Sequence, residues 1–301
     1  FQGPRLIASG CGITVPEGHA RLFAKKATTP EEGRALVHEH FSNGADQIKL
    51  FITGGVFDAE VEGEPGVLRM PLDIAQAVCD EAHKLGLRTS AHIESTEGVK
   101  VGLKAGVDTI EHGAPLTDEL LKLFKKNGLG NASSLTCTLS PALPFAVLSP
   151  EKTHSTHVQK VNGRVVYEGV ATATRQALAN GIPVGLGTDS ACPFVTHYDM
   201  WREVVYFQRH TGVTPEFALH TATLKNAQLL GVANETGSIE TGKSADLIVL
   251  DANPLNDLCA LRNVEQVYMA GKPVKYKAKH LPKIDAELDG IMDGLDNDPF
   301  V

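Results

Sequence analysis

The apolar positions of the chain alternate between two spacings. Stretches with apolar residues three and four apart end repeatedly at a glycine, and a short hydrophobic run of strand type follows directly. Glycine readily takes the left-handed conformation that closes a helix, so each junction predicts a helix end. Five units share this layout, with helices expected within 35–44, 72–86, 96–106, 117–128 (N-cap Thr117) and 170–181, and strands within 45–53, 87–93, 107–113, 129–136 and 182–190. A sixth strand is expected at 5–10.

Strands that alternate with helices predict parallel βαβ units, either in a closed barrel or in a doubly wound sheet. Polar residues at or near strand ends favour the barrel, because a barrel gathers such residues at one mouth. These residues are Lys49, His92, His112 and Asp189. The expected fold class is therefore α/β, a TIM-like (β/α)8 barrel with about six of its eight strands visible. The other two strands are expected to precede residue 1 in a longer parent protein, or to come from another segment.

After residue 237 the pattern changes to short β runs with turn glycines and no long helix between them. Three segments follow. Residues 1–237 are expected to form the barrel, incomplete at its N-terminus, and 238–278 to supply the C-terminal strands of a small appended β-sandwich. Residues 279–301 are acidic and predict a surface helix or tail.

Composition excludes several classes of protein. The net charge of -8 and the scattered Lys and Arg residues argue against a nucleic-acid partner and favour a small-molecule substrate. Five cysteines, far apart and without a C-x-x-C pair, indicate free thiols in a reducing compartment. The chain shows no membrane span and no signal peptide at its first residues, so no membrane partner and a cytoplasmic location are expected. The sequence leaves open whether the protein is a homo-oligomer.

His92 and His112 end consecutive predicted strands, so a barrel would hold them side by side. Paired imidazoles suit zinc or another divalent first-row metal. Either histidine alone could equally be a hydrogen-bonded residue of the core or rim. Asp189 follows a glycine-rich strand and could bind the same metal or move protons, or it could simply begin a turn. Lys49 lies inside the strand 45–53, where an ammonium group is costly unless it is paired, deprotonated or modified.

The segments IKLFITGG, AHIES, IEHG, GLGTDS and GSIETGKSADLIVLDANPL together resemble the metal-dependent amidohydrolase superfamily, in its imidazolonepropionase-related, prolidase-like branch. The resemblance covers residues 4 to 275. It implies Zn²⁺, as one or two divalent ions, with Lys49 carbamylated by CO₂ as the bridging ligand. His92 and His112 would be further ligands. Asp189 would be both a ligand and the catalytic acid/base.

The family also uses a His-x-His pair on its first strand, which this sequence lacks at the expected place. The HEH of His38 and His40 lies on a predicted helix and is assigned to its solvated face. His154 and His157 have the wrong spacing and are assigned to the surface. The missing pair agrees with the missing strands, and both favour a longer parent protein.

The resemblance implies hydrolysis of an amide C–N bond by a metal-activated hydroxide, in a dipeptide, an N-acyl amino acid or a cyclic amide. Four residues on loops after the strands could bind a substrate carboxylate: His19, Arg69, Tyr198 and Arg202. Two alternatives stay open. The same site could open lactones or esters or deaminate rings, or the chain could be a metal-free scaffold of this fold.

Overall fold

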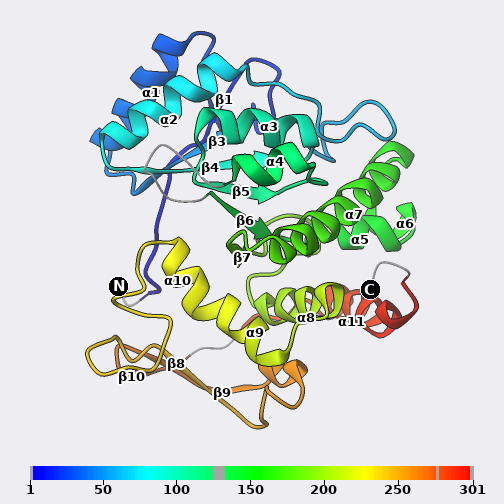
Figure 1. The fold of residues 1–301 in the computed structure, drawn as a ribbon. Coiled ribbons are helices and arrows are strands. Elements are labelled where there is room, and N and C mark those ends of the chain that lie inside the picture. The colour runs from blue at the N-terminus through cyan, green and yellow to red at the C-terminus, as the bar shows by residue number, and fades with distance from the viewer. Residues whose placement is uncertain (1–2, 125–132, 276–277, 299–301) are drawn as a thin grey trace.

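The computed structural model describes residues 3–124, 133–275 and 278–298 (Figure 1). Its centre is a parallel seven-stranded sheet with the strand order β2-β1-β3-β4-β5-β6-β7. The strands are β1 (Ile13–Thr14), β2 (Lys25–Lys26), β3 (Gln47–Phe51), β4 (Arg88–Ile93), β5 (Thr109–His112), β6 (Ser134–Cys137) and β7 (Val184–Leu186). Within the described part of the chain the sheet stays open, since β2 and β7 do not pair. The α/β class and the parallel order agree with the predicted barrel type.

Helices follow the strands as the glycine junctions predict. The first four are α1 (Pro30–Ser42), α2 (Leu72–Lys84), α3 (Thr96–Ala105) and α4 (Asp118–Leu123). Thr117 is the N-cap of α4, as expected, because its hydroxyl accepts from the N–H of Leu120. Gly106 ends α3 with φ of +89°, the left-handed conformation that favours glycine. The strand expected at 129–136 begins at Ser134, and residues 129–132 lie outside the described residues.

The alternation in β3 separates the hydrophobic core from the inner face of the sheet. Ile48 and Leu50 have no exposed surface and pack with the helices, and each such burial stabilises the fold by about 1.5–3 kcal/mol. Gln47, Lys49 and Phe51 alternate with them and are only partly buried. The lysine therefore lies on the face of the strand opposite the core.

The prediction of a strand at 5–10 is wrong. That segment is irregular and runs beside the start of β3, where the N–H of Asp46 donates to Ala8 O (2.8 Å). In return, the N–H of Ala8 donates to the Asp46 carboxylate instead of a backbone carbonyl (2.9 Å). Because the side chain takes this donor, no strand ladder forms. The first strand is instead β1.

A long helix, α7 (His157–Ala179), precedes β7, and the shorter α5 (Leu143–Val147) and α6 (Pro150–Thr153) lie before it. The chain after β7 continues through α8 (Met200–Thr211), α9 (Pro215–His220), a π-helix (Thr221–Lys225) and α10 (Asn226–Leu229). No helix of the described residues is long and apolar enough to cross a membrane.

The C-terminal part forms a separate antiparallel sheet of β8 (Leu247–Leu250), β9 (Val264–Met269) and β10 (Lys272–Val274), in the order β10-β9-β8. The 3-10 turn Leu258–Arg262 precedes β9, and α11 (Pro282–Gly294) with the 3-10 turn Leu295–Asn297 follows the sheet. These elements have the kinds expected after residue 237. The exact domain boundaries stay predictions.

Candidate metal centre

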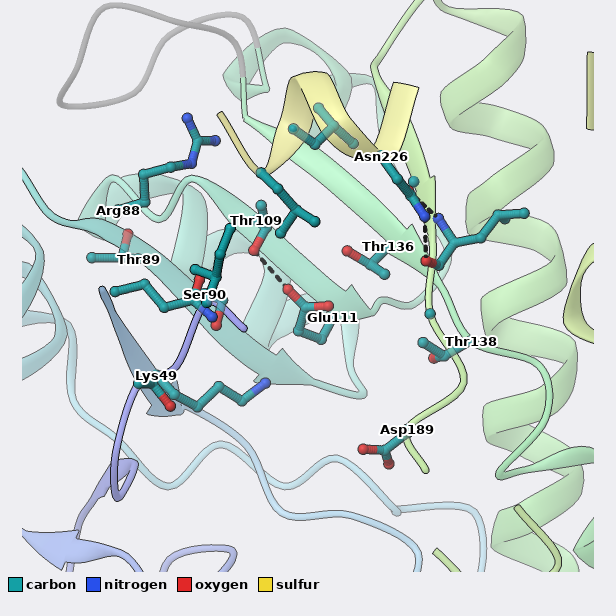
Figure 2. A pocket seen from close by; sticks show the side chains of 18 of the residues that line it. Lys49, Arg88, Thr89, Ser90, Thr109, Glu111, Thr136, Thr138, Asp189 and Asn226 are labelled. Carbon is teal, nitrogen blue, oxygen red and sulfur yellow. Dashed lines mark hydrogen bonds between the residues drawn. The ribbon is translucent and has the colours of Figure 1, made fainter. Parts of the chain in front are cut away.

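The register of the sheet brings the predicted residues of β3, β4 and β5 to one end. Phe51 is paired with His92, and Ile93 with His112, while Lys49 lies two residue pairs before Phe51, opposite Ser90. A pocket of about 370 Å³ opens on this face of the sheet. Its lining includes Lys49, His112 and Asp189, and Figure 2 shows the Lys49 amine and the Asp189 carboxylate pointing into the same space.

His92 and His112 lie edge to face, with ring centroids 4.8 Å apart. His92 Nε2 donates to the carbonyl of Gly54 (3.1 Å), which leaves Nδ1 free to bind a ligand. His112 Nδ1 lies 2.7 Å from Thr138 Oγ1, which leaves Nε2 free. Burial lowers the pKa of His112 to about 4 and holds that of His92 well below its usual value. Both rings are therefore neutral at pH 7, the form that binds metals.

Two of the four predicted residues have left-handed backbones. On β5, Thr109 and Glu111 line the pocket and Ile110 is fully buried, so a regular strand would turn His112 toward the side of Ile110. His112 has φ of +71°, and its side chain lines the pocket instead. Asp189 has φ of +54°. Such strain costs about 1–3 kcal/mol for each residue and is commonly found at functional sites.

Asp189 follows β7 and is held by its neighbours in the pocket. The Cys192 thiol donates to its Oδ2 (3.0 Å). Burial acts to raise the pKa of Asp189, but His112, the Cys192 hydrogen bond, Lys49 and His19 together outweigh burial, and the pKa lies below its ordinary value. The side chain is therefore a carboxylate at pH 7.

Lys49 has no ion pair among the described residues, although its amine lies 5.7 Å from the centre of the Phe51 ring. Burial lowers the pKa of Lys49, and the charges of Glu111 and Asp189 oppose this only in part. A lowered pKa increases the fraction of neutral amine, which is the reactive form of lysine.

Sequence analysis missed Glu94. Ligand atoms of His92, Glu94 and His112 all lie within 4.8 Å of one another, a grouping that could hold a metal ion. Burial raises the pKa of Glu94 to about 8, and its Oε2 has no hydrogen-bond partner. The strand period of two could have found it, because Glu94 follows His92 by two residues.

The four residues predicted to bind substrate lie in different parts of the molecule. His19 stacks on His92, with ring centroids 4.2 Å apart, and its Nδ1 contacts Asp58 Oδ1 at 2.7 Å. Arg69 lies after β3, where its Nε is buried without a hydrogen-bond partner. Tyr198 and Arg202 contact α11 instead, through Asp285 (2.9 Å) and Asp289 (2.7 Å). Of the four, only His19 contacts the histidine pair.

Four histidines are assigned to the surface by the sequence, and three of them are exposed. His38 is exposed and contacts Glu81, and His154 and His157 are exposed. His40, in contrast, is 5% exposed, so its assignment to a solvated face is wrong. Its ring packs beside Gly10, where a Cβ atom would lie 3.3 Å from Nδ1. The irregular segment 5–10 therefore covers this side of α1.

The ligand atoms around the histidine pair fit a divalent cation. Two neutral imidazoles each have one ring nitrogen held by an oxygen and the other free, which is the usual arrangement of metal-binding histidines. Asp189 supplies a carboxylate nearby, and Glu94 supplies a carboxyl group that a bound cation would ionise. Glu94 Oε2 is buried and unpartnered, as expected of a group that contacts a ligand.

Comparison with known proteins shows what the chain is similar to. It is 43% identical to a putative prolidase from Bifidobacterium longum, covering 97% of this chain and 71% of that one with a TM-score of 0.90. It is 30% identical to a Xaa-Pro dipeptidase whose structure has methionine bound in the active site (TM-score 0.78, covering 92% and 69%). Ochratoxinase of Aspergillus niger is 25% identical, over 91% of this chain and 60% of the relative.

The chain thus spans about 60% of the length of that curated relative. The sequence profile of the amidohydrolase family matches residues 1–274, nearly the whole chain. The parallel strands, with the histidine pair at their carboxyl ends, agree with this match. The chain belongs to the amidohydrolase family.

Proposed function

We propose that the protein is a metal-dependent hydrolase that cleaves an amide C–N bond in a small molecule. The observation that carries this proposal is the convergence of Lys49, His92, His112 and Asp189 at one end of the sheet, with two neutral imidazoles among them. Prolidase, Xaa-Pro dipeptidase and ochratoxinase are named among the similar proteins. These names support a dipeptide, an N-acyl amino acid or a related amide as the substrate.

His92 Nδ1 and His112 Nε2 would hold the cation, for which we propose Zn²⁺. Lys49 would join them as the carbamate, a proposal supported by its lowered pKa and by the absence of an ion pair among the described residues. When bound, a divalent cation supplies Lewis acidity for a carbonyl and lowers the pKa of a water molecule.

Asp189 would move the proton. Its Oδ2 already accepts from the Cys192 thiol, so Oδ1 is the atom free to accept a proton from the attacking water. The same carboxyl group would then give the proton to the leaving nitrogen. The lowered pKa supports this role, because the group is ionised before the reaction and can act as a base.

His19 would orient the substrate. It lies against His92, and its side chain is 21% exposed, so it can contact both the pocket and a bound molecule. The contact with Asp58 fixes the ring through Nδ1, and the doubly protonated ring would donate its Nε2–H to a substrate carboxylate. Arg69, Tyr198 and Arg202 remain predictions for this role. Five free cysteines support a reducing compartment such as the cytoplasm.

Metal analysis of the protein purified with added Zn²⁺ and bicarbonate tests the proposal. We expect about one or two ions per chain and turnover of at least one member of a panel of dipeptides, N-acyl amino acids, lactones, esters and amino-heterocycles. Lys49→Ala should lose metal and hydrolysis together, whereas Lys100→Ala, at an exposed lysine paired with Glu119, should lose neither.

Full metal and full activity in Lys49→Ala would show that the assignment of Lys49 is wrong. If the protein turned over only lactones, esters or heterocycles, the proposal of an amide substrate would be wrong. A protein that binds no ion and hydrolyses nothing would be the metal-free scaffold.

A further inference from the structure

Glu203 is a buried acid of α8 that lies outside the lining of the pocket and has no exposed surface. Its carboxylate accepts from four donors of a single loop. These are the N–H of Leu139 (2.8 Å), the N–H and hydroxyl of Ser140 (2.8 and 2.5 Å) and the thiol of Cys137 (3.7 Å). A carboxylate has about four acceptor positions, so this loop occupies all of them.

The loop held by Glu203 contains the partner of His112. Thr138 lies between Cys137 and Leu139 and is 3% exposed, and its Oγ1 lies 2.7 Å from His112 Nδ1. The N–H of Gly187 fixes the other side of the loop by donating to Cys137 O (3.0 Å). A Cβ at Gly187 would lie 3.2 Å from the Thr136 methyl, so this glycine lets its segment approach β6 closely.

His112 needs an outside partner to orient its ring. It is the last residue of β5 and has a left-handed backbone, so the regular strand does not set the direction of its side chain. The contact of Nδ1 with Thr138 is the hydrogen bond that the structure gives this ring. When Nδ1 carries the proton, Nε2 keeps its lone pair toward the pocket.

We propose that Glu203 is a positioning residue for His112. Glu203 fixes the loop 137–140, the loop fixes Thr138, and Thr138 fixes the ring orientation and tautomer of His112. This inference rests on the proposed function, because it assumes that His112 Nε2 binds a cation. The alternative is that Glu203 only stabilises the fold, and metal affinity separates the two readings.

The first test uses the Thr138 hydroxyl. Thr138→Val keeps the shape of the side chain and removes the hydrogen bond, whereas Thr138→Ser keeps the hydroxyl. We expect Zn²⁺ affinity, measured by titration with a competing chelator, to fall about 10- to 100-fold in Thr138→Val. Thr138→Ser should stay within about twofold of the unaltered protein. Equal affinity in all three proteins would overturn the proposal.

The second test uses Glu203 itself. In Glu203→Gln the side-chain NH₂ faces a backbone N–H, two donors that repel, so the loop must shift. We expect Zn²⁺ affinity to fall about tenfold and the ¹⁵N signals of the His112 ring to show a mixture of tautomers. The double variant Glu203→Gln/Thr138→Val should bind Zn²⁺ no more weakly than Thr138→Val alone, because both changes act through one hydrogen bond. Glu216→Gln, at an exposed acid of α9, is the matched control.

A folded Glu203→Gln with unaltered affinity, or a double variant whose losses add, would overturn the proposal. If Glu203→Gln does not fold, the two Thr138 variants and Ser140→Ala, which removes one donor to Glu203, carry the test. Failure of the proposed function can be distinguished from failure of the positioning role. In that case His112→Ala would bind Zn²⁺ as tightly as the unaltered protein, whereas a failed positioning role leaves His112→Ala defective.

Discussion

The pocket at the end of the sheet and the contact region between α8 and the C-terminal segment use similar residues in opposite ways. We call the second region the seam and define it by Tyr198, Arg202, His210, Arg262, Asp285, Asp289 and Asp298. In the seam, Arg202 lies 2.7 Å from Asp289 and 3.4 Å from Asp199, and Arg262 lies 3.0 Å from Asp289. In the pocket, Lys49 has no ion pair among the described residues.

The difference teaches how to separate structural from functional polar groups. Charged groups of the seam are paired with one another, as expected when a buried charge serves the fold. Nε and Nη1 of Arg202 also lack a hydrogen-bond partner, but this guanidinium lies between two carboxylates of the seam. The candidate metal centre instead has free ligand atoms, since Glu94 Oε2 has no partner and each of the two histidines has one free ring nitrogen. Residue types alone do not reveal this difference, because both regions contain histidine, aspartate and a basic residue.

The largest expected effect is a loss of kcat that one aspartate variant shows and a matched one does not. Asp189→Asn should lower kcat about 10³-fold, because the amide cannot accept the proton of the attacking water. Asp289→Asn, the matched change in the seam, should leave kcat within about twofold. Steady-state rates on the best substrate of the panel, with circular dichroism to check folding, measure both. Equal losses in the two variants would remove the distinction between the regions.

The next effect concerns the stability of the seam. Arg202 is 2% exposed, and its guanidinium also lies over the Trp201 ring at 4.5 Å. Arg202→Ala removes these contacts, leaves Asp199 without its ion-pair partner and leaves Asp289 with Arg262 alone, which should lower the free energy of unfolding by about 3 kcal/mol. Urea unfolding measures this loss. Unchanged stability together with a raised KM would instead support the predicted substrate role of Arg202.

The smallest effect is a pH dependence of stability that His210 should cause. Its Nδ1 donates to Tyr206 O (2.7 Å), its Nε2 accepts from the Tyr167 hydroxyl, and burial lowers its pKa from 6.5 to about 4. Between these values the unfolded chain binds the proton and the folded chain does not, so stability falls as the pH falls. From pH 7 to pH 5 the loss should be about 2 kcal/mol.

Comparing the unaltered protein with His210→Phe isolates this contribution, because phenylalanine keeps the ring and does not titrate. Urea unfolding at several pH values should give a steeper loss for the unaltered protein. Parallel curves would mean that His210 does not take up a proton on unfolding in this range.

Much of the site could be predicted from local pattern. The alternation in residues 45–53 sets the face of Lys49, and strand ends followed by glycine or polar residues mark His92, His112 and Asp189. These signals are local, because a strand has a period of two and parallel strands end at one edge. The left-handed backbones of His112 and Asp189 left no comparable signal, since neither residue is a glycine.

What the sequence did not reveal depends on contacts between distant segments. Glu203 contacts residues more than sixty positions earlier in the chain, and no spacing rule connects them. His40 is buried because the irregular segment 5–10 covers it, although the pattern of that segment predicts a strand. Tyr198 and Arg202 likewise contact a helix far along the chain.

At His112 and Asp189, selection for activity and selection for thermal stability favour different residues, because both residues have left-handed backbones. Replacing either residue by glycine would release local strain of about 1–3 kcal/mol and remove a group that the proposed reaction needs. A library screened only for survival at high temperature should therefore enrich inactive variants at these two positions. Directed evolution of this protein would have to score turnover in every round.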